Sequence, residues 1–173
     1  MLTAEYVTSS AKARELRQAF DAAFAAPPPA AKTPTVALLL VRAGGGLLAV
    51  KRADVTGFVR GENIALTPGR SPAFLGLAGL RGGLYPVWSL ARLLDRPAAS
   101  AAAKWLVLTE PRGGIPCAFA CEAFEKMIFV PETAMIAPAR PDALAMAPWD
   151  SGLVPVVDLP ALHADILKRK ESI

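Results

Sequence analysis

Apolar residues occur along the chain in short runs, and glycine or proline separates most of these runs. One run covers residues 36–42, three glycines follow at 44–46, and a further run covers 47–51. Short apolar runs bounded by turn residues favour β-strands, and glycine allows the backbone between them to reverse. The pattern predicts a β-hairpin across residues 36–51.

A second pattern of strand, turn and strand covers Pro72–Pro97 and continues into a short helical tail. Within it, Leu84–Trp88 is rich in β-branched and aromatic residues, which favours a mostly buried strand. Ser89 follows this strand, and its hydroxyl can accept a hydrogen bond from a free amide in the first turn of a helix at Leu90–Leu94. We therefore predict a hairpin whose second strand leads directly into a capped helix.

The residues at this joint return near the C-terminus at a constant offset of 69 residues, the difference between Gly83 and Gly152. The recurring residues are Gly83, Leu84, Pro86, Val87, Leu90 and Leu93, which return as Gly152, Leu153, Pro155, Val156, Leu159 and Leu162. Asp158 stands where the first copy has Ser89, and both residue types are good helix N-caps. A register held this long predicts two related substructures. The alternative is two unrelated edge strands that each contain proline.

Helical periodicity is strongest at the two ends of the chain. Residues 10–26 form a predicted amphipathic helix, which ends at Pro27–Pro29 because proline cannot continue it. The apolar stripe of this helix consists of Leu16, Phe20 and Phe24. The stripe could pack on the chain's own core or on a partner, and the pattern does not decide between the two.

A C-terminal helix is predicted over residues 160–169. Its inward-facing residues are Leu159, Leu162 and Ile166. We therefore divide the chain into an N-terminal helix with a proline-rich linker, residues 1–33, and a domain at residues 34–173.

Between these helices, further strands are predicted at residues 104–109, 117–121 and 126–130, and the proline-rich stretch 131–148 is interpreted as a loop. Many short strands with glycine and proline turns favour an all-β barrel or sandwich.

The composition supports a folded chain, because 53% of its 173 residues are hydrophobic. The apolar runs are too short to cross a bilayer, and the N-terminus lacks the pattern of a secretory signal, so we expect a cytoplasmic protein without direct membrane insertion. Cys117 and Cys121 would lie about 13 Å apart in a strand, too far for a disulfide. With a single histidine in the chain they cannot complete an ordinary structural zinc site, so we expect two buried thiols.

The net charge of +4 does not indicate nucleic-acid binding. Lysines and arginines are scattered, and the only run, Lys168-Arg169-Lys170, has no aromatic residues among it. A solvated helix end explains this run, because cations are favourable at a helix C-terminus.

No pattern typical of a catalytic site is present. His163 is the sole histidine and is interpreted as a solvated residue of the C-terminal helix. The glycines at 76, 79 and 82 do not have the spacing of a nucleotide-binding loop, and a hairpin explains them. We expect a protein that is not an enzyme and that has no catalytic residue, cofactor or metal.

The stretch from Gly76 to Gly82, followed by Pro86 to Leu90, resembles the signature of the CheW-like domain, which reads roughly G-x-x-N-L-R-G-x-x-x-P-V-x-D-L. Two positions depart from it: Gly79 replaces the asparagine and Ser89 replaces the aspartate. Glycine keeps access to a left-handed turn at position 79, and serine keeps a helix cap. The resemblance covers roughly residues 35–167.

The resemblance implies two small SH3-like β-barrels packed about a shared apolar seam, with the N-terminal and C-terminal helices added. It also implies a non-catalytic adaptor that couples the cytoplasmic tip of a methyl-accepting chemoreceptor to the regulatory domain of a CheA-type histidine kinase, in chemotaxis or surface motility. Such a protein lies in the cytoplasm at receptor arrays. The alternative is a small-barrel module that binds peptide or nucleic acid outside chemosensory signalling.

By the same resemblance, Arg81 lies near the receptor-contacting surface, together with apolar residues of the seam. The predicted partner-binding residues are Arg81, Gly76, Gly79, Leu80, Gly82, Asp54 and Val55. An arginine beside a glycine-rich turn can instead form a salt bridge or cap a carbonyl, and both interpretations remain open.

Overall fold

The computed structural model describes residues 12, 14, 15, 17, 18, 33–61, 64–67, 71–97, 104–110, 115–138, 143–150 and 152–171. The chain divides into two compact units, Met1–Thr33 and Pro34–Ile173. In the first unit the described residues between 12 and 18 are helical. The predicted apolar stripe of Leu16, Phe20 and Phe24 lies outside the described residues.

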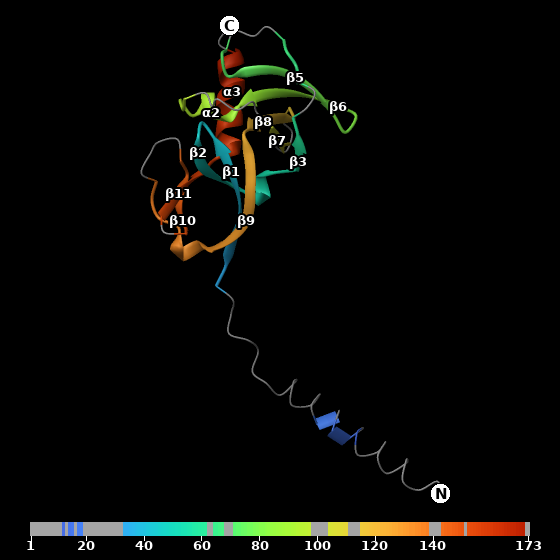
Figure 1. Ribbon diagram of the computed structural model, residues 1–173, viewed down its shortest axis with the longest axis vertical. Helices are drawn as coiled ribbons and strands as arrows, with labels where there is room; N and C mark the ends of the chain where they lie inside the picture. Colours follow the sequence, from blue (N-terminus) through green and yellow to red (C-terminus); the bar gives the residue numbers. More distant parts are fainter. Residues whose placement is uncertain are drawn as a thin grey trace, which may run out of the picture. The chain divides into compact units, whose positions relative to one another are not determined.

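The second unit contains two sheets (Figure 1). The first sheet has the order β10-β11-β2-β1-β9 and is called the first barrel here. Its strands are β1 (Thr35–Ala43), β2 (Gly46–Lys51), β9 (Ala123–Pro131), β10 (Ala145–Trp149) and β11 (Gly152–Val157). The predicted hairpin at residues 36–51 is confirmed, since β1 and β2 pair antiparallel around the glycines.

The second sheet has the order β3-β7-β8-β6-β5-β4 and is called the second barrel. Its strands are β3 (Gly57–Arg60), β4 (Ile64–Ala65), β5 (Phe74–Leu80), β6 (Gly83–Ser89), β7 (Trp105–Thr109) and β8 (Cys117–Cys121). The remaining elements are the 3-10 turns η1 (Arg52–Asp54) and η2 (Glu132–Ala134) and the helices α2 (Leu90–Leu93) and α3 (Leu159–Glu171).

Five strands of each barrel follow one topology. In the first barrel β9, β1 and β2 pair antiparallel, β2 pairs parallel with β11, and β11 forms a hairpin with β10. In the second barrel β3, β7 and β8 pair antiparallel, β8 pairs parallel with β6, and β6 forms a hairpin with β5. The two related substructures predicted from the repeat, and the fold of two SH3-like barrels, are confirmed.

Three apolar clusters hold this unit together. Strand alternation sends Leu38 and Leu40 into the first barrel, and it sends Leu39 and Val41 to the opposite face of β1. That opposite face belongs to a cluster shared by both barrels, the seam, which also contains Leu90, Phe119, Val157 and Leu159. The third cluster fills the second barrel around Tyr85, Val87 and Leu106.

Both copies of the strand-to-helix joint are capped as predicted. The Ser89 hydroxyl accepts a hydrogen bond from the Arg92 amide at 3.4 Å, and Asp158 Oδ1 accepts one from the Ala161 amide at 3.0 Å. The residue after each cap, Leu90 or Leu159, is fully buried in the seam.

The predicted left-handed turn at Gly79 is wrong. The register pairs Leu80 with Gly83, so only Arg81 and Gly82 are left to make the turn, and their φ angles are 50° and 77°. A two-residue hairpin turn of this kind needs positive φ at both central residues. Gly79 therefore lies within β5.

Two further predictions are corrected. The stretch 131–148, interpreted as a loop, contains the end of β9 and most of β10. Pro148 is compatible with a strand because β10 is at the edge of its sheet, where a missing amide costs no ladder hydrogen bond. Within the strand predicted to be mostly buried, Leu84 is 63% exposed, because it lies near the free end of the hairpin.

Candidate partner-binding surfaces

Arg81 lies at the tip of the β5–β6 hairpin and its side chain reaches the start of β3. Its Nη1 donates to the carbonyl oxygen of Thr56 at 3.4 Å. The guanidinium also lies over Gly57, where a Cβ atom would come within 2.8 Å of Arg81 Nη2. Of the interpretations left open, the carbonyl cap is therefore present, although the residue as a whole stays exposed. The guanidinium has five donors, so one long bond leaves it able to contact a partner.

Asp54 and Val55 precede the carbonyl that Arg81 binds, but their side chains lie in different environments. Val55 is buried in the seam, so it supports the core and offers no surface to a partner. Asp54 is half-buried, and desolvation raises the pKa of its carboxyl above the ordinary value. Lys51 lowers this pKa and Asp158 raises it further.

The remaining predicted site residues, on β5 and its turn, also differ in how deeply they are buried. Gly76 is buried with a φ of 137°, and a Cβ atom there would overlap the backbone carbonyl of Ala65, so this glycine serves backbone packing. Leu80 is half-buried against the core of the second barrel. Gly79 and Gly82 are exposed, and nothing lies within 4 Å of a Cβ atom built on either. Of these predicted site residues, only Gly82 shares the turn with Arg81, and Gly79 is exposed two residues earlier on β5.

A surface that the sequence interpretation missed lies where the edge strands β3 and β9 meet. The ring centroids of Phe58 on β3 and Phe124 on β9 are 4.9 Å apart, and Phe58 also packs on Trp105 at 5.2 Å. Farther along β9, Met127 and Phe129 are exposed, Phe129 to 65%. We call Phe58, Phe124, Met127 and Phe129 the seam ridge.

The register places the β9 residues of the ridge on one face. Phe124, Met127 and Phe129 pair with Val41, Leu39 and Ala37 of β1. Val41 and Leu39 belong to the seam, and cross-strand partners lie on the same face of a sheet. A register shift between Leu40 and Val41 breaks the alternation of β9. Strict alternation of side chains along the sequence therefore does not place Phe124 on the same face as Met127 and Phe129.

Arg81 does not lie on the seam ridge. Phe58 pairs with Val107, a seam residue, whereas Gly57 pairs with Leu108 in the interior of the second barrel. Because successive residues of a strand point to opposite faces, Arg81 over Gly57 and the ring of Phe58 lie on opposite sides of β3. The structure therefore separates Arg81 from the apolar seam residues with which it was expected to act.

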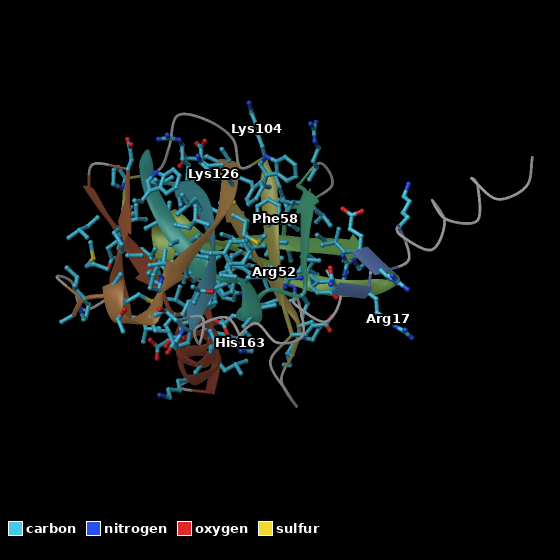
Figure 2. The ribbon with its side chains drawn as sticks, turned by 90° about the horizontal axis from the view of Figure 1, so that it is seen from below. Arg17, Arg52, Phe58, Lys104, Lys126 and His163 are labelled. Atoms are coloured by element: carbon cyan, nitrogen blue, oxygen red, sulfur yellow. The ribbon has the colours of Figure 1, made fainter. Side chains whose placement is uncertain are left out.

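Charged side chains of β1 and β9 lie on the other face of the sheet from the seam ridge, because Arg42 follows the seam residue Val41 and Lys126 pairs with Leu40, which points into the first barrel. Arg42 Nε donates to Glu125 Oε1 at 2.6 Å, and Lys126 Nζ lies 4.2 Å from the centroid of the Trp149 ring. Figure 2 shows Lys104 and Lys126 on the same side of the unit as Phe58, with His163 on the other side.

His163 is not solvated as predicted. It is 5% exposed, and its Nε2 lies 2.8 Å from the carbonyl oxygen of Ile115, to which the Nε2–H tautomer donates. His163 follows Leu159 by four residues and precedes Ile166 by three, so it lies on the buried face of α3. The spacing of His163 from Leu159 and Ile166 could therefore have predicted its burial from the sequence.

Both thiols are buried and free. Burial raises the pKa of Cys117 to about 11 and the pKa of Cys121 to about 12. A neutral thiol is a weak nucleophile. Among the described residues, no group of three or more His, Cys, Asp or Glu side chains could hold a metal ion. None of the described helices is long and apolar enough to cross a membrane.

The comparisons with known proteins agree with this architecture. The family model of the CheW-like domain matches residues 37–166. Among solved structures, the chain is similar to the scaffolding protein TtCheW from Thermoanaerobacter tengcongensis, with a TM-score of 0.68 and 16% identity over 79% of this chain and 92% of that one. At this identity the likeness shows the fold alone. The comparison with curated proteins gives no match.

Proposed function

Because the chain belongs to the CheW-like domain family, we propose that it couples the cytoplasmic tip of a methyl-accepting chemoreceptor to the regulatory domain of a CheA-type histidine kinase. Members of this family are non-catalytic scaffold proteins, and the chain is a chemotaxis scaffold of this kind. We assign the adaptor role to residues 34–173. Both partners present these parts in the cytoplasm, where we place the protein.

The observation that carries the proposal is the seam ridge. Exposed large apolar side chains in a continuous row mark an interaction site on a folded protein. From Phe124 to Phe129 the ridge follows β9 for about 17 Å, given a rise of about 3.4 Å per residue. That length matches about three turns of an α-helix. An amphipathic helix, such as the tip of a helical receptor, fits this row with apolar side chains spaced three and four residues apart.

We assign the receptor to the seam ridge and not to Arg81 because apolar and charged side chains contribute differently to binding. Burying Met127 and Phe129 removes apolar surface from water, which supplies affinity, whereas an exposed arginine contributes mainly orientation. The kinase domain is expected to bind outside the ridge, so that both partners are held at once.

The test replaces Met127 and Phe129 together by serine and measures binding to a receptor's cytoplasmic fragment and to the kinase regulatory domain. We expect receptor binding to weaken at least tenfold, about 1.4 kcal/mol, with kinase binding retained. Leu66→Ser is the matched control, because Leu66 is an exposed leucine beside β4, at the edge of the second sheet opposite β3. Receptor binding that is unchanged in the double variant, or RNA binding as tight as receptor binding in the natural chain, would refute the proposal.

A further inference from the structure

The sulfur atoms of the described residues belong to side chains that differ in their access to solvent. Met127 on β9 is 45% exposed. Met135 and Met146 are half-buried, and Met135 packs against the core of the first barrel. Cys117 and Cys121 are 2% and 1% exposed. Among the sulfur-bearing side chains that the structure describes, Met127 is therefore the one that a small oxidant in solution reaches most readily.

The two thiols are also in the wrong protonation state for such an oxidant. Peroxides react with the thiolate form of cysteine, so oxidation follows thiolate character and exposure. Burial raises the pKa of Cys117 to about 11 and that of Cys121 to about 12, so both stay neutral near pH 7. A thioether has no proton to lose, and its sulfur keeps a lone pair for an oxidant. Oxidation is therefore directed to Met127 and away from both cysteines.

Met127 lies where a change of polarity affects binding most directly. It stands between Phe124 and Phe129 in the β9 row of the seam ridge, and its cross-strand partner is the seam residue Leu39. These three neighbours have hydrocarbon side chains and carry no side-chain hydrogen-bond donor. An oxygen atom added to the sulfur would find no side-chain donor among them once a partner covers the ridge.

We propose that Met127 is a site of reversible oxidation, where a peroxide converts the thioether to a sulfoxide and thereby prevents a receptor helix from binding the seam ridge. The sulfur lone pair attacks one peroxide oxygen, an S–O bond forms and the O–O bond breaks. Sulfur is oxidised by two electrons and the peroxide is reduced by two. The second oxygen leaves as water with the proton that the transferred oxygen gives up. A thiol-dependent sulfoxide reductase reverses the step, releasing the oxygen as water while two thiols become a disulfide.

This inference rests on the proposed receptor site and adds a means of regulating it. The methionine side chain is apolar and flexible, whereas the sulfoxide is polar and accepts hydrogen bonds from water. Burying such a group without a donor opposes binding, so oxidation is expected to weaken receptor binding about tenfold. Because Met127 is exposed in the free chain, its oxidation should leave the melting temperature unchanged. A bound receptor covers the sulfur, so oxidation acts on the free chain and blocks assembly.

The test treats the full chain with hydrogen peroxide and locates the added oxygen by peptide mass mapping. Met127 is expected to be oxidised faster than Met135 and Met146, with both cysteines unmodified. A saturating amount of a receptor's cytoplasmic fragment should slow oxidation at Met127 and leave the rate at Met146 unchanged. Affinity for the same fragment is measured before and after oxidation. Treatment with sulfoxide reductases for both epimers should restore the affinity that was lost.

The decisive quantity is the ratio of the affinities before and after peroxide, so that each variant is compared only with itself. For Met127→Leu this ratio should be close to one, because leucine has no sulfur to oxidise. Met146→Leu is the matched control, and its ratio should equal that of the natural chain because Met127 is still present. Met127→Gln places a neutral polar side chain at the position and should weaken receptor binding without any oxidant.

A Met127→Leu chain that loses as much affinity on oxidation as the natural chain overturns the proposal, because the effect then arises at another residue. Complete oxidation of Met127 with unchanged receptor affinity overturns it as well. Failure of the receptor proposal has a different signature, since the serine variant of Met127 and Phe129 then binds the receptor like the natural chain. If only the sulfoxide proposal fails, that serine variant still binds more weakly.

Discussion

The β5–β6 and β10–β11 hairpins agree at their buried positions and differ at their exposed ones. Val87 and Val156 are fully buried in equivalent places, and Leu90 and Leu159 meet in the seam. At the solvent, arginine is replaced by aspartate at the tip and glycine by proline beside it. Packing within a shared core tolerates few alternatives, whereas exposed positions were free to take separate roles.

The elements that follow the hairpins differ as well. α2 has four residues and α3 has thirteen, although both begin with a leucine in the seam. Only α3 continues far enough to bring His163 and Ile166 onto the core. The β10–β11 hairpin is thus followed by a long helix that packs on the core, whereas the β5–β6 hairpin is followed by a helix of a single turn.

The largest effect of a substitution on stability is expected at Gly76, which corresponds to Ala145 in the second hairpin. Gly76→Ala should lower the free energy of unfolding by about 3 kcal/mol, because its φ of 137° is open only to glycine and the new methyl meets the Ala65 carbonyl. Urea unfolding measures this. Gly79→Ala is the control, and it should change stability by less than about 1 kcal/mol because the site is open. Equal effects at the two glycines would contradict the packing role of Gly76.

The second prediction concerns β8 and its counterpart β2. By the same offset Cys117 corresponds to Leu48, and both lie in the seam, but only the thiol can ionise. An unfolded thiol releases its proton near pH 8.5, whereas burial raises the pKa of Cys117 to about 11 in the native chain. The native state therefore holds more protons above pH 9, and stability falls as the pH rises, by at most about 1.4 kcal/mol per thiol per pH unit.

Chemical unfolding at pH 8, 9 and 10 tests this expectation. A variant with Cys117→Ala and Cys121→Ala should have a flatter dependence over this range, whatever its stability at pH 8. An unchanged slope would show that the thiols are ionised to the same degree in both states.

The smallest predicted effect is the difference in stability lost when each of the two helix caps is removed. Asp158→Ala should cost about 1 kcal/mol, because a charged cap on a thirteen-residue helix also interacts with the helix dipole. Ser89→Ala should cost about 0.5 kcal/mol, since its hydrogen bond is longer and α2 has a single turn. Thermal melting compares the two. Ser89→Asp should be neutral or stabilising, and a larger loss at Ser89 than at Asp158 would reverse the comparison.

Much of the fold could be predicted from local sequence. The hairpin at 36–51, the joint at Leu84–Leu93, both helix caps and the strand that holds both cysteines follow from residue types that act within a few positions of each other. The repeat predicted two related substructures, because the same local pattern builds the same hairpin and helix start twice. These features depend on turn geometry, capping and strand rise, which neighbouring residues determine.

The candidate site could be predicted only in part, because its residues are assembled by distant segments. Sequence identified Arg81 but not the pairing of Leu80 with Gly83, which moves the left-handed turn from Gly79 to Arg81 and Gly82. Val55 and Gly76 were predicted partner-binding residues, yet the surrounding barrels bury them. The seam ridge arises where two edge strands of different sheets meet and a bulge changes the alternation of β9. Local sequence determined which elements form, and tertiary packing decided which of their side chains remain at the surface, because burial depends on what lies opposite each face.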